Sequence, residues 1–129
     1  MSQFAGSSSS ERQSLIVEAI DAHRVRESQY CTFEAEQTEE KTLAWVQYRA
    51  VDGLLNLDCT PEEREQLTDV LETYPELSIT EQTQPEDAEG INIRIQGYTD
   101  DQRLAEFIDI IFQRVYEQDE DYRLWVAEI

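Results

Sequence analysis

The stretch "INIRIQGYTDDQRLAEFIDIIFQRV", residues 91–115, contains the two hydrophobic periods that decide the fold. Its first five residues alternate isoleucine with a polar residue, which is the period of a strand with one buried face. After Gly97 the apolar residues recur three and four positions apart, as on one face of a helix. These residues are Leu104, Phe107, Ile108, Ile111, Phe112 and Val115. The stretch therefore predicts a strand over 91–97 and an amphipathic helix after it.

The residues between the strand and the helix predict where the helix begins. We expect Thr99 to be its N-cap, with Gln102 at the position that completes a capping box. Asp100 and Asp101 then fall in the first turn, where acidic side chains interact favourably with the helix dipole.

An earlier stretch, "LLNLDCTPEEREQLTDVL" at residues 54–71, has the same layout. Alternation predicts a strand over 54–59, and Thr60, Pro61 and Glu63 predict a capped helix after it. The expected buried residues of this unit are Leu55, Leu57, Cys59, Leu67, Val70, Leu71 and Tyr74. The buried positions of the two units fall out of phase when their threonines are aligned. We interpret them as a repeated supersecondary unit rather than a duplication.

The N-terminal part predicts a tail and a helix. Residues 1–9 are serine-rich and lack a period, so we expect a disordered tail before a single domain over 10–129. Ser10 is the expected helix cap, with Gln13 at the capping-box position. The apolar face of this helix carries Leu15, Ile16, Ala19 and Ile20, with His23 at its edge.

Three further segments predict strands, at 30–37, 42–50 and 77–83. Residues 38–40 could instead begin a helix that continues through 42–50, so this segment has two interpretations. Residues 122–129 are expected to form either a sixth strand or a final helical turn. The two cysteines, Cys31 and Cys59, have no metal-binding spacing and are expected to be buried and reduced.

This order, α-βββ-α-ββ-α-β, predicts an α+β two-layer sandwich: an antiparallel sheet of five or six strands with three helices on one face. By element order, most of the chain resembles the type III secretion chaperones, and the extra C-terminal segment departs from that order. Those chaperones are small, acidic and typically dimeric, but one architecture hosts many activities, so the resemblance implies a fold and little about function.

Charge is the strongest feature of the composition. The chain has 29 acidic and 10 basic residues, for a net charge of −19, and Lys41 is its only lysine. Spread over roughly 7,000 Å² of folded surface, the acids lie about 15 Å apart, within reach of one another when the Debye length is about 10 Å in dilute salt. This composition resembles the proteins of haloarchaea, whose cytoplasm is concentrated brine. The alternatives are an acidic protein that binds basic partners and a DNA mimic.

Several functions are disfavoured by the sequence. It has no secretion signal and no apolar run long enough to cross a bilayer, so we expect a soluble, cytoplasmic protein without membrane partners. Direct binding to a nucleic-acid backbone is disfavoured because few cations could replace the phosphate counterions. We find no phosphate loop, nucleophile motif, metal-ligand spacing or catalytic residues, and we expect no cofactor.

The best interaction candidates are aromatic or cationic side chains expected on the outward face of the sheet. They are Trp45, Arg49, Arg94, Tyr98 and Trp125. Alternatively, Arg49 and Arg94 pair with Glu34, Glu36 and other cross-strand acids. We predict a non-catalytic interaction or regulatory module that dimerises through a sheet face or edge. The rival is a small-molecule-binding domain or weak enzyme with its site at the helix N-termini near Thr60 and Thr99, which a pocket converging on His23 would favour.

The carboxylate excess predicts a salt dependence that can be measured. Repulsion between acids should oppose folding in dilute buffer, and molar KCl should screen it. We expect the thermal unfolding midpoint, followed by circular dichroism, to rise from salt-free buffer to 2–3 M KCl. Equal midpoints in the two buffers would contradict the brine interpretation.

Overall fold

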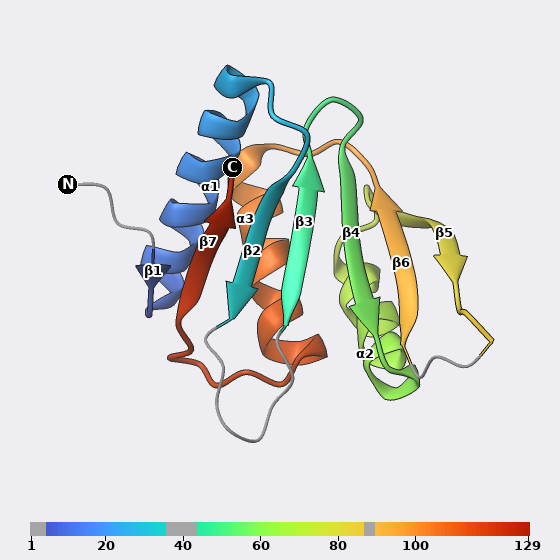
Figure 1. Cartoon of the computed structure of the whole chain (residues 1–129). Coiled ribbons are helices and arrows are strands. Elements are labelled where there is room, and N and C mark those ends of the chain that lie inside the picture. The colour runs from blue at the N-terminus through green and yellow to red at the C-terminus, as the bar shows by residue number, and fades with distance from the viewer. Residues whose placement is uncertain (1–4, 36–43, 87–89) are drawn as a thin grey trace.

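The computed structural model describes residues 5–35, 44–86 and 90–129. Three helices lie behind one face of a twisted sheet, and in the described residues no helix covers the other face (Figure 1). The helices are α1 (Ser9–Arg26), α2 (Pro61–Thr73) and α3 (Asp101–Ile110), and α3 continues into a π-helical turn, η1 (Ile111–Val115). The strands are β1 (Ala5–Gly6), β2 (Cys31–Ala35), β3 (Trp45–Arg49), β4 (Leu54–Cys59), β5 (Ser78–Thr83), β6 (Ile91–Gln96) and β7 (Leu124–Glu128).

The predicted α+β fold and its element order are confirmed. The sheet is antiparallel throughout, in the order β1-β7-β2-β3-β4-β6-β5. Residues 45–49 form a strand, so the helical alternative for 42–50 is wrong, and the C-terminal segment is a strand rather than a helical turn. The two-residue β1 makes seven strands, one more than predicted, by pairing with β7.

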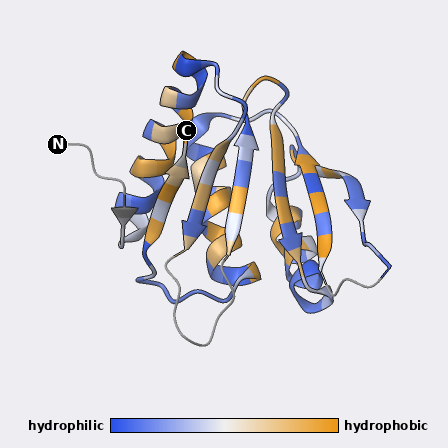
Figure 2. Cartoon of the chain, in the orientation of Figure 1, coloured by the Kyte–Doolittle hydropathy of each residue, from blue (hydrophilic) through white to orange (hydrophobic). Residues whose placement is uncertain are grey.

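Alternation along the strands places the core between the sheet and the helices (Figure 2). Ile91, Ile93 and Ile95 are buried on β6 while the residues between them are partly exposed. All six residues of the predicted third-helix stripe are buried as well. Cys31 and Cys59 are buried, free thiols, and desolvation raises the pKa of each to about 12. The sheet therefore buries one face.

The start of α1 corrects two predictions. The N-cap is Ser8, not Ser10: its hydroxyl accepts the Glu11 N–H at 3.1 Å, and the Glu11 carboxylate accepts the Ser8 N–H at 3.2 Å. A carboxylate is a stronger acceptor than the Gln13 amide and also favours the positive end of the helix dipole. Residues 5–9, expected in the tail, instead hold β1, the N-cap Ser8 and the first residue of α1. Residues 1–4 lie outside the described residues.

The start of α3 corrects a third prediction, the position of its N-cap. Its N-cap is Asp100, whose carboxylate accepts the Arg103 N–H at 2.9 Å, while the Thr99 hydroxyl donates to Glu76 at 3.1 Å. Asp is a strong cap because its charge also interacts with the dipole. By contrast, α2 begins as predicted, with Thr60 as N-cap, Pro61 in the first turn and Glu63 completing the capping box.

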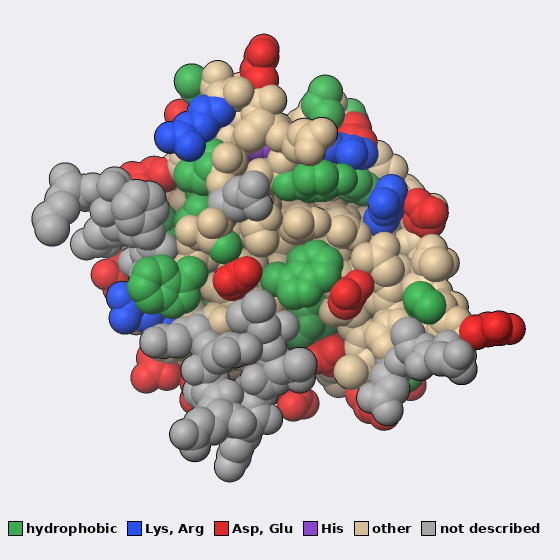
Figure 3. All heavy atoms as spheres, viewed as in Figure 1, with side chains coloured by type: hydrophobic (Ala, Val, Ile, Leu, Met, Phe, Trp, Pro, Cys, Tyr) green, Lys and Arg blue, Asp and Glu red, His purple; other side chains and the backbone are tan. Residues whose placement is uncertain are grey.

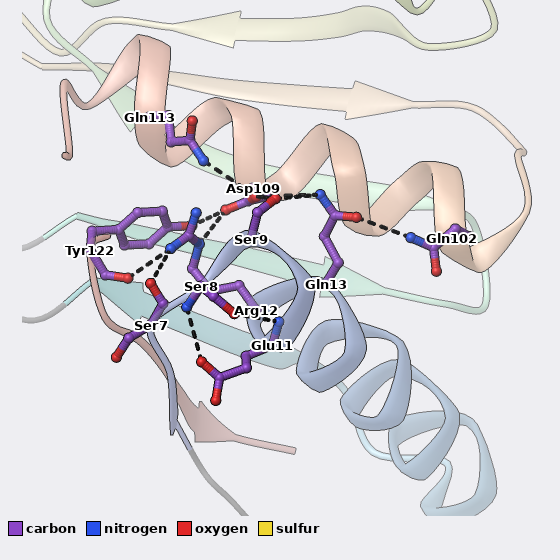
Figure 4. Close-up of polar contacts among 10 residues, drawn as sticks. All are labelled: Ser7, Ser8, Ser9, Glu11, Arg12, Gln13, Gln102, Asp109, Gln113 and Tyr122. Carbon is purple, nitrogen blue, oxygen red and sulfur yellow. Dashed lines mark hydrogen bonds and ion pairs between the residues drawn. The ribbon is translucent and has the colours of Figure 1, made fainter. Parts of the chain in front are cut away.

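A buried ion pair that the sequence analysis missed joins α1 to α3 (Figure 4). Arg12 is 0% exposed and Asp109 is 1% exposed, and Nε of Arg12 lies 2.6 Å from Oδ1 of Asp109. The Arg12 guanidinium also donates to the carbonyl oxygens of Ser7 and Tyr122, at 2.8 and 3.0 Å. Its central carbon lies 4.0 Å from the centroid of the Tyr122 ring, a cation–π contact that partly offsets desolvation.

The Asp109 carboxylate is surrounded by donors. Besides Arg12, the Tyr122 hydroxyl donates to it at 2.7 Å, and burial together with this bond raises the pKa of Tyr122. The Ser9 hydroxyl donates to its other oxygen at 3.3 Å, and Gln13 and Gln113 donate at 3.4 and 3.3 Å. A buried charge is tolerated when it is paired and hydrogen-bonded in this way.

Breaking this pair should cost far more than breaking an exposed pair between the same two helices. Arg12→Met leaves Asp109 as an uncompensated buried charge, and we expect a loss of about 3–5 kcal/mol in the free energy of unfolding. Arg24→Met is the matched control, because Arg24 also lies on α1 and pairs with Asp101 of α3, but with 43% of its side chain exposed. We expect this control to cost about 1 kcal/mol or less.

Urea unfolding in molar KCl would measure both losses. The double variant Arg12→Met/Asp109→Leu should recover part of the loss of Arg12→Met, because it removes the stranded charge. An Arg12→Met protein as stable as Arg24→Met would contradict the structural role of the pair.

Candidate functional site

The sheet face turned away from the helices, called here the outer face, carries the predicted tryptophans. Glu34 of β2 pairs in register with Trp45 of β3 on one side and with Trp125 of β7 on the other. The three side chains therefore form one row across neighbouring strands, and both tryptophans are partly buried. The Arg123 guanidinium carbon lies 4.5 Å from the Trp125 ring centroid, so its charge covers part of this indole.

A second row of polar side chains crosses the middle of the outer face. The Asn92 amide donates to Asn56 at 2.9 Å, and the Asn56 amide donates to Gln47 at 3.1 Å, linking β6, β4 and β3. Asn92 also donates to Asp58 at 3.0 Å. These amides satisfy one another and contain no nucleophile or base, so they fix side-chain positions on the face rather than supply a chemistry.

The structure separates the five predicted interaction residues into two groups. Trp45, Trp125 and Arg94 lie on the outer face, within the strands. Arg49 lies at the end of β3, beside the turn to β4, and Tyr98 follows the end of β6 and is 77% exposed. The face and this end of the sheet are therefore different surfaces, a division that strand alternation alone could not reveal.

The two predicted arginines pair differently. Arg94 lies 3.6 Å from Glu81 on the adjacent strand, as the cross-strand alternative expected. Arg49 instead forms a two-pronged pair with Asp52 in the β3–β4 turn, at 2.9 and 2.6 Å, and donates to the Tyr30 hydroxyl at 3.2 Å. The expected pairing with Glu34 is therefore wrong for Arg49, and Glu36 lies outside the described residues.

The outer face is much less acidic than the chain as a whole. Its described charged side chains are Arg94 and Arg123 against Glu34, Asp58 and Glu81. Two cations thus meet three acids, whereas the whole chain has 10 basic residues against 29 acidic ones. Figure 3 looks onto this face and shows hydrophobic side chains at the surface, with basic and acidic side chains among them.

A pocket of about 600 Å³ lies at one end of the sheet, between the last turn of α1, residues 28–30 and the turn after β3. His23 lines it and is 2% exposed. Its Nε2 accepts the Ala50 N–H at 3.1 Å, so the neutral ring carries its proton on Nδ1 and donates to the Ser28 hydroxyl at 2.7 Å. Burial, and then the charge of Arg24, lower the pKa of His23.

The rival hypothesis, a small-molecule site at the helix N-termini, agrees with the structure in one feature and disagrees in another. A pocket does reach His23, but it lies at the C-terminal end of α1 and not at the helix N-termini near Thr60 and Thr99. Both ring nitrogens of His23 are occupied in the fold, which makes it a structural residue in this geometry. Within the described ranges, no three His, Cys, Asp or Glu side chains are grouped so as to hold a metal ion. None of the helices in those ranges is both long and apolar enough to span a bilayer.

Comparison with known proteins gives a family and no function. Residues 1–129 match the family described as "Family of unknown function (DUF7975)". No curated protein and no solved structure matches the chain.

His23 should make stability depend on pH in a defined window. Its lowered pKa means that the unfolded chain, with a pKa near 6.5, binds the proton more readily than the folded chain. The stabilisation should be complete above about pH 6.5 and be lost as the pH falls through the lower pKa of the folded state. We expect the free energy of unfolding of the wild type to fall from pH 7.5 to 5.5 relative to His23→Gln, whose amide stays neutral.

Urea titrations at fixed KCl concentration would measure this difference. The window stops at pH 5.5 so that the carboxylates remain ionised in both proteins. Parallel pH profiles for the wild type and His23→Gln would show that His23 does not titrate differently on folding.

Proposed function

We propose that this chain, which belongs to the DUF7975 family, is a non-catalytic interaction module that binds a second copy of itself through the outer face. The observation that carries the proposal is the small excess of acids on that face. Two copies with a charge of −19 each repel one another. A face with two cations against three acids, and with two partly exposed indoles, is where such copies can approach with the smallest electrostatic penalty.

The composition of the face also suits a protein contact. Interface cores are enriched in tryptophan and arginine, and this face presents Trp45 and Trp125 together with Arg94 and Arg123. The amide row beside the tryptophans is already hydrogen-bonded, so covering it with a partner leaves few groups unsatisfied. The two indoles and the satisfied amide row can be desolvated at low cost, and Glu34 between the indoles is the group that needs a cation from the partner.

The size of the face is compatible with a homodimer. Strands about 4.8 Å apart with a rise of about 3.3 Å per residue give a seven-stranded sheet a projected area on the order of 500 Å². Side-chain relief increases the accessible area toward the roughly 800 Å² that each partner buries in a standard interface. A two-fold axis through the face would let the acids of one copy meet the arginines of the other.

Concentrated cytoplasmic salt is part of the proposal. Molar salt reduces the Debye length to about 3 Å, which leaves short-range contacts in place and removes the repulsion between the two acidic bodies. The dimer should therefore be favoured by the same salt that favours folding.

Size-exclusion chromatography with light scattering in 2–3 M KCl would test the dimer. We expect the wild type to have twice the chain mass and Trp45→Asp to be a monomer, because the substitution removes an indole and puts a second carboxylate beside Glu34 at the centre of the interface. Tyr98→Asp is the matched control: it adds the same charge at an exposed aromatic residue off the outer face, and it should remain dimeric. Circular dichroism would establish that both variants are folded. A monomeric wild type, or a Trp45→Asp dimer, would overturn the proposal.

A further inference from the structure

We propose a second site, independent of the outer face: the pocket beside His23 binds a small organic cation with an apolar body. The volume of about 600 Å³ lies within the range of roughly 300–1,000 Å³ typical of ligand pockets. Ala50, Val51 and the Tyr30 ring provide apolar wall, and Val51 is 85% exposed, so apolar surface is available to a ligand.

The two arginines in the pocket wall are already neutralised. Arg24 donates to both oxygens of Asp101 at 2.6 and 2.7 Å. Arg49 makes the equivalent two-pronged contact with Asp52 and is further held by the Tyr30 hydroxyl. An anionic ligand would have to compete with these carboxylates at both positions. The arginines therefore act as fixed walls rather than as an anion site.

The remaining charge of the pocket is negative. His23 is neutral, since its Nε2 accepts a backbone N–H and burial lowers its pKa. Glu27 lines the pocket and has no ion pair with any described residue. It is also the C-cap of α1, where the last helical carbonyls concentrate partial negative charge. A carboxylate beside a helix C-terminus, in a molecule of net charge −19, attracts a cation.

The ligand class follows from these walls. An ammonium group would lie near Glu27 and the α1 carbonyls, and its apolar body would lie against Ala50 and Val51. Benzylamine has this shape, while benzyl alcohol and benzoate share its ring with neutral and negative charge. The three probes therefore separate charge recognition from simple burial of an aromatic ring.

Amide NMR shifts of the full chain would test the site, at the lowest KCl concentration that keeps the chain folded. We expect benzylamine to shift the amides of Gln29, Tyr30, Ala50 and Val51, with tighter binding than benzyl alcohol or benzoate. Glu27→Gln should weaken benzylamine binding by about two- to fivefold, as removal of an exposed charge partner does. Glu120→Gln is the control, because it removes the same charge from an exposed residue that does not line the pocket.

The outcomes distinguish a site from general attraction to an acidic protein. No shift at these amides, tighter binding of benzoate than of benzylamine, or equal weakening by Glu27→Gln and Glu120→Gln would each overturn the proposal. Trp45→Asp should leave benzylamine binding unchanged, so loss of the proposed dimer would not be mistaken for loss of the pocket.

Discussion

The buried pair of Arg12 and Asp109 is the interaction on which the arrangement of the helical layer depends. It joins α1 to α3 across 97 positions of sequence, and the same arginine holds the carbonyl oxygens of Ser7 and Tyr122. The segments that lead into α1 and β7 are thus fixed to one guanidinium. Because two ions leave water when the helices pack, the pair constrains how they pack more than it adds net stability. Any packing that left either ion buried alone would be strongly disfavoured.

The second constraint is the distribution of charge. A chain with so many acids can fold only if its apolar residues are concentrated on one side of each element, and the strands alternate accordingly. The exposed carboxylates then point to solvent from the helices and loops. The outer face differs from this pattern, since it has two arginines against three acids and its indoles lie in one row with Glu34. This difference from the rest of the surface is the reason why we propose that the outer face binds a second copy of the chain.

Charged side chains are arranged differently at the end of the molecule that holds the pocket. There, Arg24 and Arg49 are each paired with an aspartate, and His23 is held neutral by a backbone N–H. Pairing lets cations contribute structure without leaving an attractive site for anions. Glu27, which has no ion pair with a residue that the structure describes, and the end of α1 then make the local field negative, so a positively charged ligand is expected there.

The sequence by itself determined the α+β fold class, the order of helices and strands, and most of the buried positions. These depend on period and capping, which are local: residues 91–115 specify a half-buried strand and an amphipathic helix wherever they lie. Capping was predicted correctly at Thr60 and displaced at Ser8 and Asp100, because neighbouring acceptors compete and a carboxylate is favoured at a helix N-terminus. The sequence contained a signal for the buried pair, since Arg12 and Asp109 interrupt the apolar faces of α1 and α3. It did not show that these two side chains contact each other.

Only the tertiary structure decided which distant groups share a surface. It placed Trp45 and Trp125 on either side of Glu34, moved Arg49 and Tyr98 to another end of the sheet, and formed the pocket beside His23. Register, strand order and the packing of helices on the sheet fix these neighbours. They depend on contacts between residues far apart in the chain, which periodicity along the sequence does not encode.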